Sequence, residues 1–353
     1  MKKALIAMSG GVDSSVTAFL MMQQGYECTG ITFRMFDKAD SLFCFDKNTD
    51  FNKDIDDAKS VCDKLGIPFV TIDASEEFRK HVINNFIKTY EKGGTPNPCV
   101  ECNRHIKFSL LNDYAEKHGF DVIATGHYAE TGYENGRYFI KKSDDIKKDQ
   151  SYVLYPLTQK QLEKVRFPLA DITKEKAREI AEYNGLVTAH KSDSQDICFI
   201  PDGDYAGFIK RATGKTYPKG KFIDINGNIL GVHNGIINYT IGQRKGLGIA
   251  LGTPAYVKSK DIRTNTVTLS SNDELFEKEI IIENFNFMAV TALDNVRCNA
   301  KIRYAHQGAE CTASQIDNST VKIIFDTPQR APAKGQSAVL YDGEKVLGGG
   351  IIK

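Results

Sequence analysis

The segment from Ser9 to Ser15, which reads Ser-Gly-Gly-Val-Asp-Ser-Ser, restricts the fold of this chain more than any other feature. It follows a short apolar run, residues 4–8, that predicts a buried parallel strand, and it precedes residues 16–22, which predict a helix. A glycine turn between a strand and the amino end of a helix presents backbone N–H groups and the positive end of the helix dipole, which together favour phosphate. The segment therefore predicts a nucleotide site in an α/β fold.

Two common nucleotide motifs are excluded by the spacing. No Gly-Lys-Ser/Thr sequence follows at the Walker A distance, and the third glycine of the dinucleotide fingerprint is absent. The segment instead resembles the PP-loop of ATP pyrophosphatases, which split ATP between the α and β phosphates. Asp13 could hold a Mg²⁺ ion that bridges the phosphates. The competing interpretation is a serine-glycine turn that caps an ordinary helix.

The first 200 residues alternate between strand and helix patterns. Strands are predicted at residues 3–8, 28–33, 68–72 and 121–125, and helices at residues 14–24, 53–65, 76–90, 103–118 and 174–183. This rhythm predicts a doubly wound parallel sheet with its ligand at the carboxyl ends of the strands.

The residue composition and pattern change twice along the chain. Beyond about residue 201 glycines and turns become frequent, and from about residue 280 the pattern is almost purely strand. Five strands in the last segment suggest a small closed barrel. We predict a PP-loop ATP pyrophosphatase domain at residues 1–200, a small mixed central domain at residues 201–275 and a C-terminal antiparallel β-barrel at residues 276–353.

Charge and hydropathy limit the partners of the chain. The net charge is only +1, so a nucleic acid would have to be held by local basic patches. No apolar run reaches membrane-spanning length, and the first residues lead directly into a strand-length segment rather than a signal peptide. We expect a cytoplasmic protein with no membrane partner.

In a reducing compartment the eight cysteines do not indicate a disulfide scaffold. Four lie in apolar or strand-like stretches and are expected in the core, namely Cys28, Cys62, Cys298 and Cys311. Cys44 lies in a polar, aspartate-rich insertion and has no clear assignment.

Cys99 and Cys102 form a Cys-x-x-Cys pair on a proline-rich stretch just before the helix predicted at residues 103–118. The helix dipole and the cations that follow would stabilise a thiolate, so Cys102 is the better candidate for a reactive sulfur. Structural zinc would need two more ligands, and a thioredoxin-like pair would need another local fold. A reactive or cluster-binding cysteine beside a nucleotide site is the remaining interpretation. Cys198, with apolar neighbours, would by itself be considered structural.

Several motifs together resemble the tRNA-specific 2-thiouridylases. They are SGGVDSS, GGTPNPCVECNRHIKF from residue 93, ATGHYA, KKDQSYVLYPL, DSQDICFI, GQRKGLGIA and the closing LGGGII, in that order. The resemblance covers essentially the whole chain. It implies an ATP- and Mg²⁺-dependent sulfurtransferase that thiolates carbon 2 of the wobble uridine in the tRNA anticodon loop. It also implies AMP and pyrophosphate as products and a sulfur-donor protein, either a cysteine desulfurase or a sulfur relay.

The resemblance further implies roles for individual residues. Cys198 would receive a persulfide, and Cys102 would act as the nucleophile that frees hydrosulfide or closes a disulfide bond with Cys198 as sulfur leaves. Asp13 would serve the catalytic site. The ATP site would be lined by Ala7, Met8, Ser9, Gly10, Gly11, Val12, Asp13, Ser14, Phe33 and Gly126. The tRNA would be contacted by Asn97, Pro98 and Cys99 at the target base, by Lys148, Asp149 and Gln150, and by Arg303 and Tyr304, with the central domain also binding tRNA.

Cys99 leaves the mechanism open, because many members of the family carry aspartate there. Cys99, Cys102 and Cys198 could together hold a [4Fe–4S] cluster whose fourth iron carries sulfide. In that case Cys102 and Cys198 would be ligands. Two other classes also stay open: a PP-loop ligase that acts on a small molecule, and a nucleotide-sensing tRNA-binding protein without catalysis.

Overall fold

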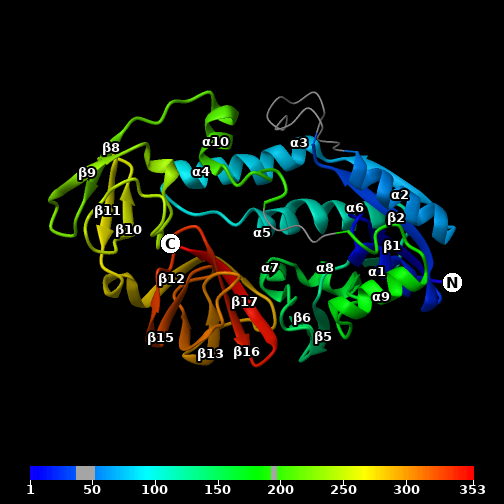
Figure 1. Ribbon diagram of the computed structural model, residues 1–353. Helices are drawn as coiled ribbons and strands as arrows, with labels where there is room; N and C mark the ends of the chain where they lie inside the picture. The colour runs from blue at the N-terminus through cyan, green and yellow to red at the C-terminus, as the bar shows by residue number, and fades with distance from the viewer. Residues whose placement is uncertain (37–51, 192–196) are drawn as a thin grey trace.

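The computed structural model describes residues 1–36, 52–191 and 197–353 (Figure 1). Its first unit is built on a parallel sheet whose strands lie in the order β3-β2-β1-β4-β7. These strands are β1 (Lys3–Ala7), β2 (Glu27–Arg34), β3 (Phe69–Asp73), β4 (Val122–Ala124) and β7 (Val165–Arg166). The predicted doubly wound parallel sheet is confirmed. The two-residue strand β7 lacks any apolar periodicity and was not predicted.

Helices cover this sheet, and two of them match the predicted bounds to the residue. Those two are α2 (Lys53–Leu65), which ends at Gly66 in the left-handed region, and α9 (Lys174–Tyr183), which Thr173 caps. The others are α1 (Val12–Gln23), α6 (Ser109–Lys117), α7 (Ser151–Leu154), α8 (Gln159–Lys164) and a continuous helical run of α3 (Ser75–Phe78), η2 (Arg79–Ile83) and α4 (Asn84–Glu91).

The helix predicted at residues 103–118 begins earlier than the sequence suggested. Asn97 caps α5 (Pro98–Cys102), whose first position is a proline, and the chain continues through η3 (Asn103–Lys107) into α6. The Cys-x-x-Cys pair therefore lies within a helix and not on a loop before it. The segment η3 is a π-helical turn, a distortion that is common at functional sites.

The central unit is a four-stranded sheet in the order β10-β11-β8-β9, preceded by α10 (Tyr205–Thr213). Its strands are β8 (Gly220–Ile223), β9 (Ile229–His233), β10 (Tyr256–Asp261) and β11 (Thr266–Ser270), with the short turn η4 (Ile236–Asn238) after β9. Phe86 and Tyr90 of α4 belong to the same apolar cluster as Phe222 and Val257 of this sheet. The helix α4 thus joins the central unit to the first unit (Figure 1).

The carboxyl-terminal unit is a closed antiparallel barrel of six strands in the order β12-β15-β14-β13-β16-β17, closed by pairing of β12 with β17. After η5 (Asp273–Leu275) these are β12 (Phe276–Phe287), β13 (Val296–Lys301), β14 (Ala309–Gln315), β15 (Val321–Arg330), β16 (Ser337–Asp342) and β17 (Lys345–Ile352). The predicted barrel is confirmed, but the closing strand β12 was not counted, because its first four residues are exposed and mostly charged.

A hairpin of the first unit extends the barrel sheet. Its strands are β5 (Glu130–Glu134) and β6 (Arg137–Lys141), and β6 pairs with β17 through Lys141 and Lys345. The expected core cysteines, Cys28, Cys62, Cys298 and Cys311, are all buried. Cys44 lies outside the described residues. Within the described ranges, every helix is too short or too polar to cross a bilayer.

Candidate active site

The PP-loop is held in shape by its own glycines and hydroxyls. Gly10 has a φ of +69°, and a Cβ there would lie 2.2 Å from the carbonyl oxygen of Asp54, so only glycine fits. The Ser14 hydroxyl donates to the Gly11 carbonyl oxygen at 3.0 Å and accepts from the Ser9 N–H at 3.1 Å. The turn before α1 is therefore preformed, as an anion site at a helix amino end requires.

The other predicted ATP-site residues lie at the same edge of the sheet. Ala7 is the last residue of β1 and Met8 follows it, Phe33 is close to the end of the neighbouring strand β2, and Gly126 follows β4 on the other side. A Cβ on Gly126 would lie 2.8 Å from the Asp13 carbonyl carbon and 2.9 Å from the Ser14 nitrogen. The fold thus brings together at one site a set that the sequence spreads over more than a hundred positions.

Asp13 is bonded by two side chains that sequence reasoning did not assign to the site. Lys174 Nζ lies 2.8 Å from both carboxylate oxygens of Asp13, and the Tyr128 hydroxyl donates to Oδ1 at 2.8 Å. Tyr128 belongs to the ATGHYA motif of the family resemblance, next to the predicted ATP-site residue Gly126, but nothing in the sequence around Lys174 indicated this contact. The partly exposed carboxylate is the type of ligand that Mg²⁺ accepts together with phosphate oxygens.

The three candidate cysteines come from two segments that fold together. Cys99 is exposed and Cys102 is buried on α5, whereas Cys198 is exposed and precedes Phe199, which belongs to the same apolar cluster as Cys102. The two segments therefore share one apolar cluster.

The predicted thiolate character of Cys102 is wrong for this conformation. Burial raises the pKa of Cys102 to about 11, against the lowering effect of the Lys107 ammonium. Cys198 reaches solvent, yet the surrounding protein displaces enough water to raise its pKa to about 12. Both sulfurs are held as thiols at neutral pH because loss of hydration outweighs the nearby cation.

The same three cysteines do not fit an iron–sulfur cluster as they stand. Among the residues that the structure describes, no three His, Cys, Asp or Glu side chains are grouped closely enough to hold a metal ion. We therefore derive no step through a cluster.

The predicted tRNA-contact residues gather beside the cysteines. The Tyr304 hydroxyl of the barrel donates to the Asp149 carbonyl oxygen at 3.1 Å, and burial, followed by negative charge on Asp149 and to a smaller extent on Cys99, raises the pKa of Tyr304. Asp149 itself is buried, and its carboxylate accepts from Ser143 and Ser151. Asp149 therefore supports this surface through internal hydrogen bonds and is not itself exposed.

The remaining predicted tRNA contacts also have internal bonds. Gln150 Oε1 accepts from the Tyr128 N–H at 3.1 Å, and Arg303 Nη1 donates to the Arg330 carbonyl oxygen at 3.1 Å. Lys148 is half-buried, and Asn97 accepts from the Val100 N–H at the start of α5.

Comparison with known proteins identifies the chain. Three family models match almost all of it: the tRNA methyl transferase HUP domain at residues 2–202, the tRNA methyl transferase PRC-barrel domain at 206–271 and the aminomethyltransferase β-barrel domain at 277–352. The tRNA-specific 2-thiouridylase MnmA of Clostridioides difficile (strain 630) is 46% identical over 355 residues, covering 100% of this chain and 98% of its own length. The chain belongs to the tRNA-specific 2-thiouridylase family.

A second relative gives the same answer. The tRNA-specific 2-thiouridylase MnmA of Treponema denticola is 45% identical and covers 99% of this chain and 98% of its own length. The predicted family is confirmed. Among solved structures, the U34-tRNA thiolase NcsA from Methanococcus maripaludis with its [4Fe–4S] cluster is 19% identical, with a TM-score of 0.36 over 60% of this chain and 66% of its own. A likeness at that level transfers no property to the 2-thiouridylase chain.

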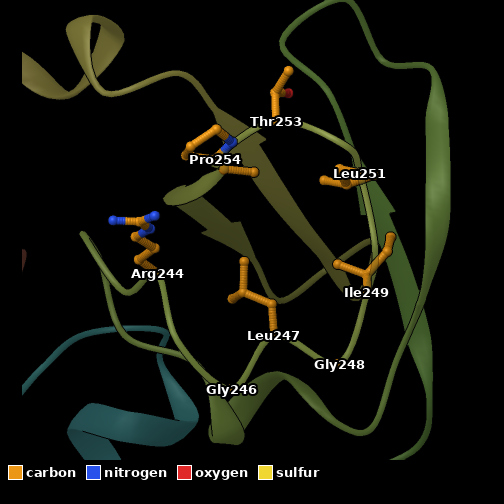
Figure 2. A pocket seen from close by; sticks show the side chains of 9 residues that line it. Arg244, Gly246, Leu247, Gly248, Ile249, Leu251, Thr253 and Pro254 are labelled. Atoms are coloured by element: carbon orange, nitrogen blue, oxygen red, sulfur yellow. The ribbon is translucent and has the colours of Figure 1, made fainter.

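One pocket of this 2-thiouridylase lies away from the nucleotide loop. It has a volume of about 300 Å³ and is lined only by residues 244–255 of the central unit. Figure 2 shows the side chains of Leu247, Ile249 and Leu251 around it, with Arg244 at one side. None of the predicted site residues lines this pocket.

Proposed function

We propose that this chain catalyses ATP-dependent 2-thiolation of the wobble uridine of tRNA, giving 2-thiouridine, AMP and pyrophosphate. The observation that carries the proposal is 46% identity to a tRNA-specific 2-thiouridylase over the full chain, in a protein that keeps both the PP-loop and the thiols. The three domains would be the PP-loop domain at residues 1–200, the tRNA-binding central domain at 201–275 and the barrel at 276–353.

Adenylation is the first half of the reaction. The uridine O2 attacks the α-phosphorus of ATP, the α–β bond breaks, and pyrophosphate leaves with the electron pair. The oxygen on carbon 2 becomes part of AMP, a far better leaving group than oxide. The preformed loop at Gly10–Ser14 would bind the phosphates, Phe33 and Gly126 would border the nucleoside, and Asp13 would hold Mg²⁺, which neutralises phosphate charge.

Sulfur transfer is the second half. A persulfide on Cys198 attacks carbon 2 with its terminal sulfur, and AMP departs. Cys102 then attacks the inner sulfur of Cys198, which releases 2-thiouridine and leaves a Cys102–Cys198 disulfide for a thiol donor to reduce. Cys102 and Phe199, the neighbour of Cys198, belong to one apolar cluster, which supports this pairing. The base would enter beside Asn97, Pro98 and Cys99, with Lys148, Gln150 and Tyr304 along the tRNA.

The sulfur comes from outside this chain. A cysteine desulfurase or sulfur-relay protein would load Cys198, whose exposed side chain supports such an exchange. We place the reaction in the cytoplasm, where tRNA, ATP and reducing thiols are available.

The decisive assay supplies a glutamate tRNA transcript, Mg²⁺, ATP and sulfide or a desulfurase-relay system. Thiolated RNA is retarded on a mercury-containing gel. The proposal expects a retarded band that needs ATP, with AMP as the nucleotide product. ADP as product, or no band with either sulfur source, would contradict it and favour a PP-loop ligase for a small molecule.

A further inference from the structure

Among the ion pairs of the described residues around the PP-loop, the one between Lys174 and Asp13 has the most deeply buried lysine. The Lys174 side chain is 7% exposed, compared with 28% for Lys191, which donates to the Gly10 carbonyl oxygen of the loop. Lys174 Nζ lies 2.8 Å from each oxygen of Asp13, and the Tyr128 hydroxyl shares Oδ1. A buried ammonium is costly to maintain, so its position beside the nucleotide loop calls for a reason beyond stability.

Both residues begin helices. Asp13 is the second residue of α1 and Lys174 is the first residue of α9, and the two helices pack along each other. Their contact therefore brings two helix amino ends together, each with a positive dipole end. Together with the ammonium these ends make the surroundings of the Asp13 carboxylate strongly attractive to a multiply charged anion.

Lys191 provides an internal comparison. Its Nζ donates to the Gly10 carbonyl oxygen at 2.9 Å and is paired with Asp54 at 2.6 Å and Asp57 at 2.7 Å. Two carboxylates therefore balance Lys191, and its bond to the loop backbone fixes the turn. Lys174 instead pairs with Asp13, the carboxylate that would bind Mg²⁺.

We propose that Lys174 binds the β- and γ-phosphates of ATP and stays with the pyrophosphate when the α–β bond breaks. This inference rests on the proposed ATP-dependent function. Without nucleotide, Asp13 holds the ammonium in place. With Mg²⁺-ATP bound, Asp13 would hold the metal ion, and the Lys174 ammonium would pair with the phosphate oxygens, where negative charge accumulates as pyrophosphate leaves.

The test is equilibrium binding by the full-length protein of Mg²⁺-ATP, Mg²⁺-pyrophosphate and AMP. Lys174→Gln is compared with Lys174→Arg and with Lys176→Gln. Lys176 provides a matched control on the same helix, because its described ion pair is with the exposed Glu179. We expect Lys174→Gln to weaken ATP and pyrophosphate by about tenfold or more, the loss typical of one charged hydrogen bond, with AMP within about twofold. Lys174→Arg should recover part of the loss.

An equal loss for AMP would show that Lys174 merely supports the loop, and no loss for pyrophosphate would also overturn the inference. If Lys174→Gln does not fold, the inference is tested instead by measuring the affinity of Asp13→Asn for pyrophosphate in the absence of Mg²⁺. That affinity should be kept or raised, because the ammonium is released from its carboxylate, and a fall would contradict the inference. Failure of the unaltered protein to bind ATP would instead refute the proposed function.

Discussion

At the nucleotide site, one contiguous stretch from Ala7 to Ser14 supplies most of the expected contacts, and its own hydroxyls fix its shape. At the thiol site, residues 99–102 and residue 198 are brought together by the apolar cluster around Phe199, and both reacting sulfurs are held protonated. The first site is preformed for its ligand, whereas the second needs a change in protonation before it reacts. Adenylation should therefore be separable from sulfur transfer.

The largest expected effect comes from removing a reacting sulfur. Cys102→Ser or Cys198→Ser should reduce thiolation by at least about 10³-fold, because each removes a nucleophile, while ATP binding stays unchanged. Mercury-gel assays and ATP titrations measure the two separately. Cys99→Ser is the matched comparison: it keeps both reacting sulfurs, so its loss should be limited to a modest weakening of tRNA binding. Equal loss for all three variants would instead favour cluster chemistry.

A change at the nucleotide site should lower ATP affinity and leave the reactivity of the thiols unchanged. Gly126→Ala places a methyl group 2.8–2.9 Å from the backbone of Asp13 and Ser14, which must shift. Overpacking of this kind costs about 1–3 kcal/mol, so ATP affinity should fall by about tenfold. Alkylation of Cys99 should be unaffected. If the Cys99 alkylation rate changes as well, the two sites are not separable.

The pKa values predict how the thiols respond to pH. With a pKa raised to about 11 for Cys102 and about 12 for Cys198, the thiolate fraction of each should rise about tenfold per pH unit between pH 7 and 9. Iodoacetamide labelling followed by peptide mass spectrometry measures this rise, with exposed Cys99 labelled first. A Cys102 rate that is already constant above pH 7 would show the stabilised thiolate, with a lowered pKa, that the sequence predicted.

The smallest effect concerns the support that the barrel gives to the thiol site. The buried Tyr152 hydroxyl donates to the Ser337 carbonyl oxygen at 2.8 Å. Tyr152→Phe should lower the free energy of unfolding by about 1 kcal/mol, measured by urea denaturation, and leave ATP affinity unchanged. Tyr133→Phe, at a side chain that is 63% exposed, should change nothing. A loss of ATP affinity in Tyr152→Phe would mean that the barrel also supports the nucleotide site.

The same contrast explains what could be predicted from the sequence. The PP-loop and the capped helix α9 follow from local rules, and α9 was predicted to the residue. The contacts of Lys174 and Tyr128 with Asp13 join positions far apart in the chain, and one sequence carries no signal for them. The thiolate prediction for Cys102 failed for a related reason: nearby cations are visible in the sequence, but burial in the apolar cluster that Cys102 shares with Phe199 is not.

A single-turnover measurement tests the central claim most directly. Anaerobically purified, iron-chelated protein loaded with persulfide would be mixed with tRNA and Mg²⁺-ATP. AMP, 2-thiouridine and the Cys102–Cys198 disulfide would then be counted by mass spectrometry. The account predicts the three products in equal amounts per active site. Formation of 2-thiouridine without AMP, or its loss on chelation with persulfide still in place, would contradict it.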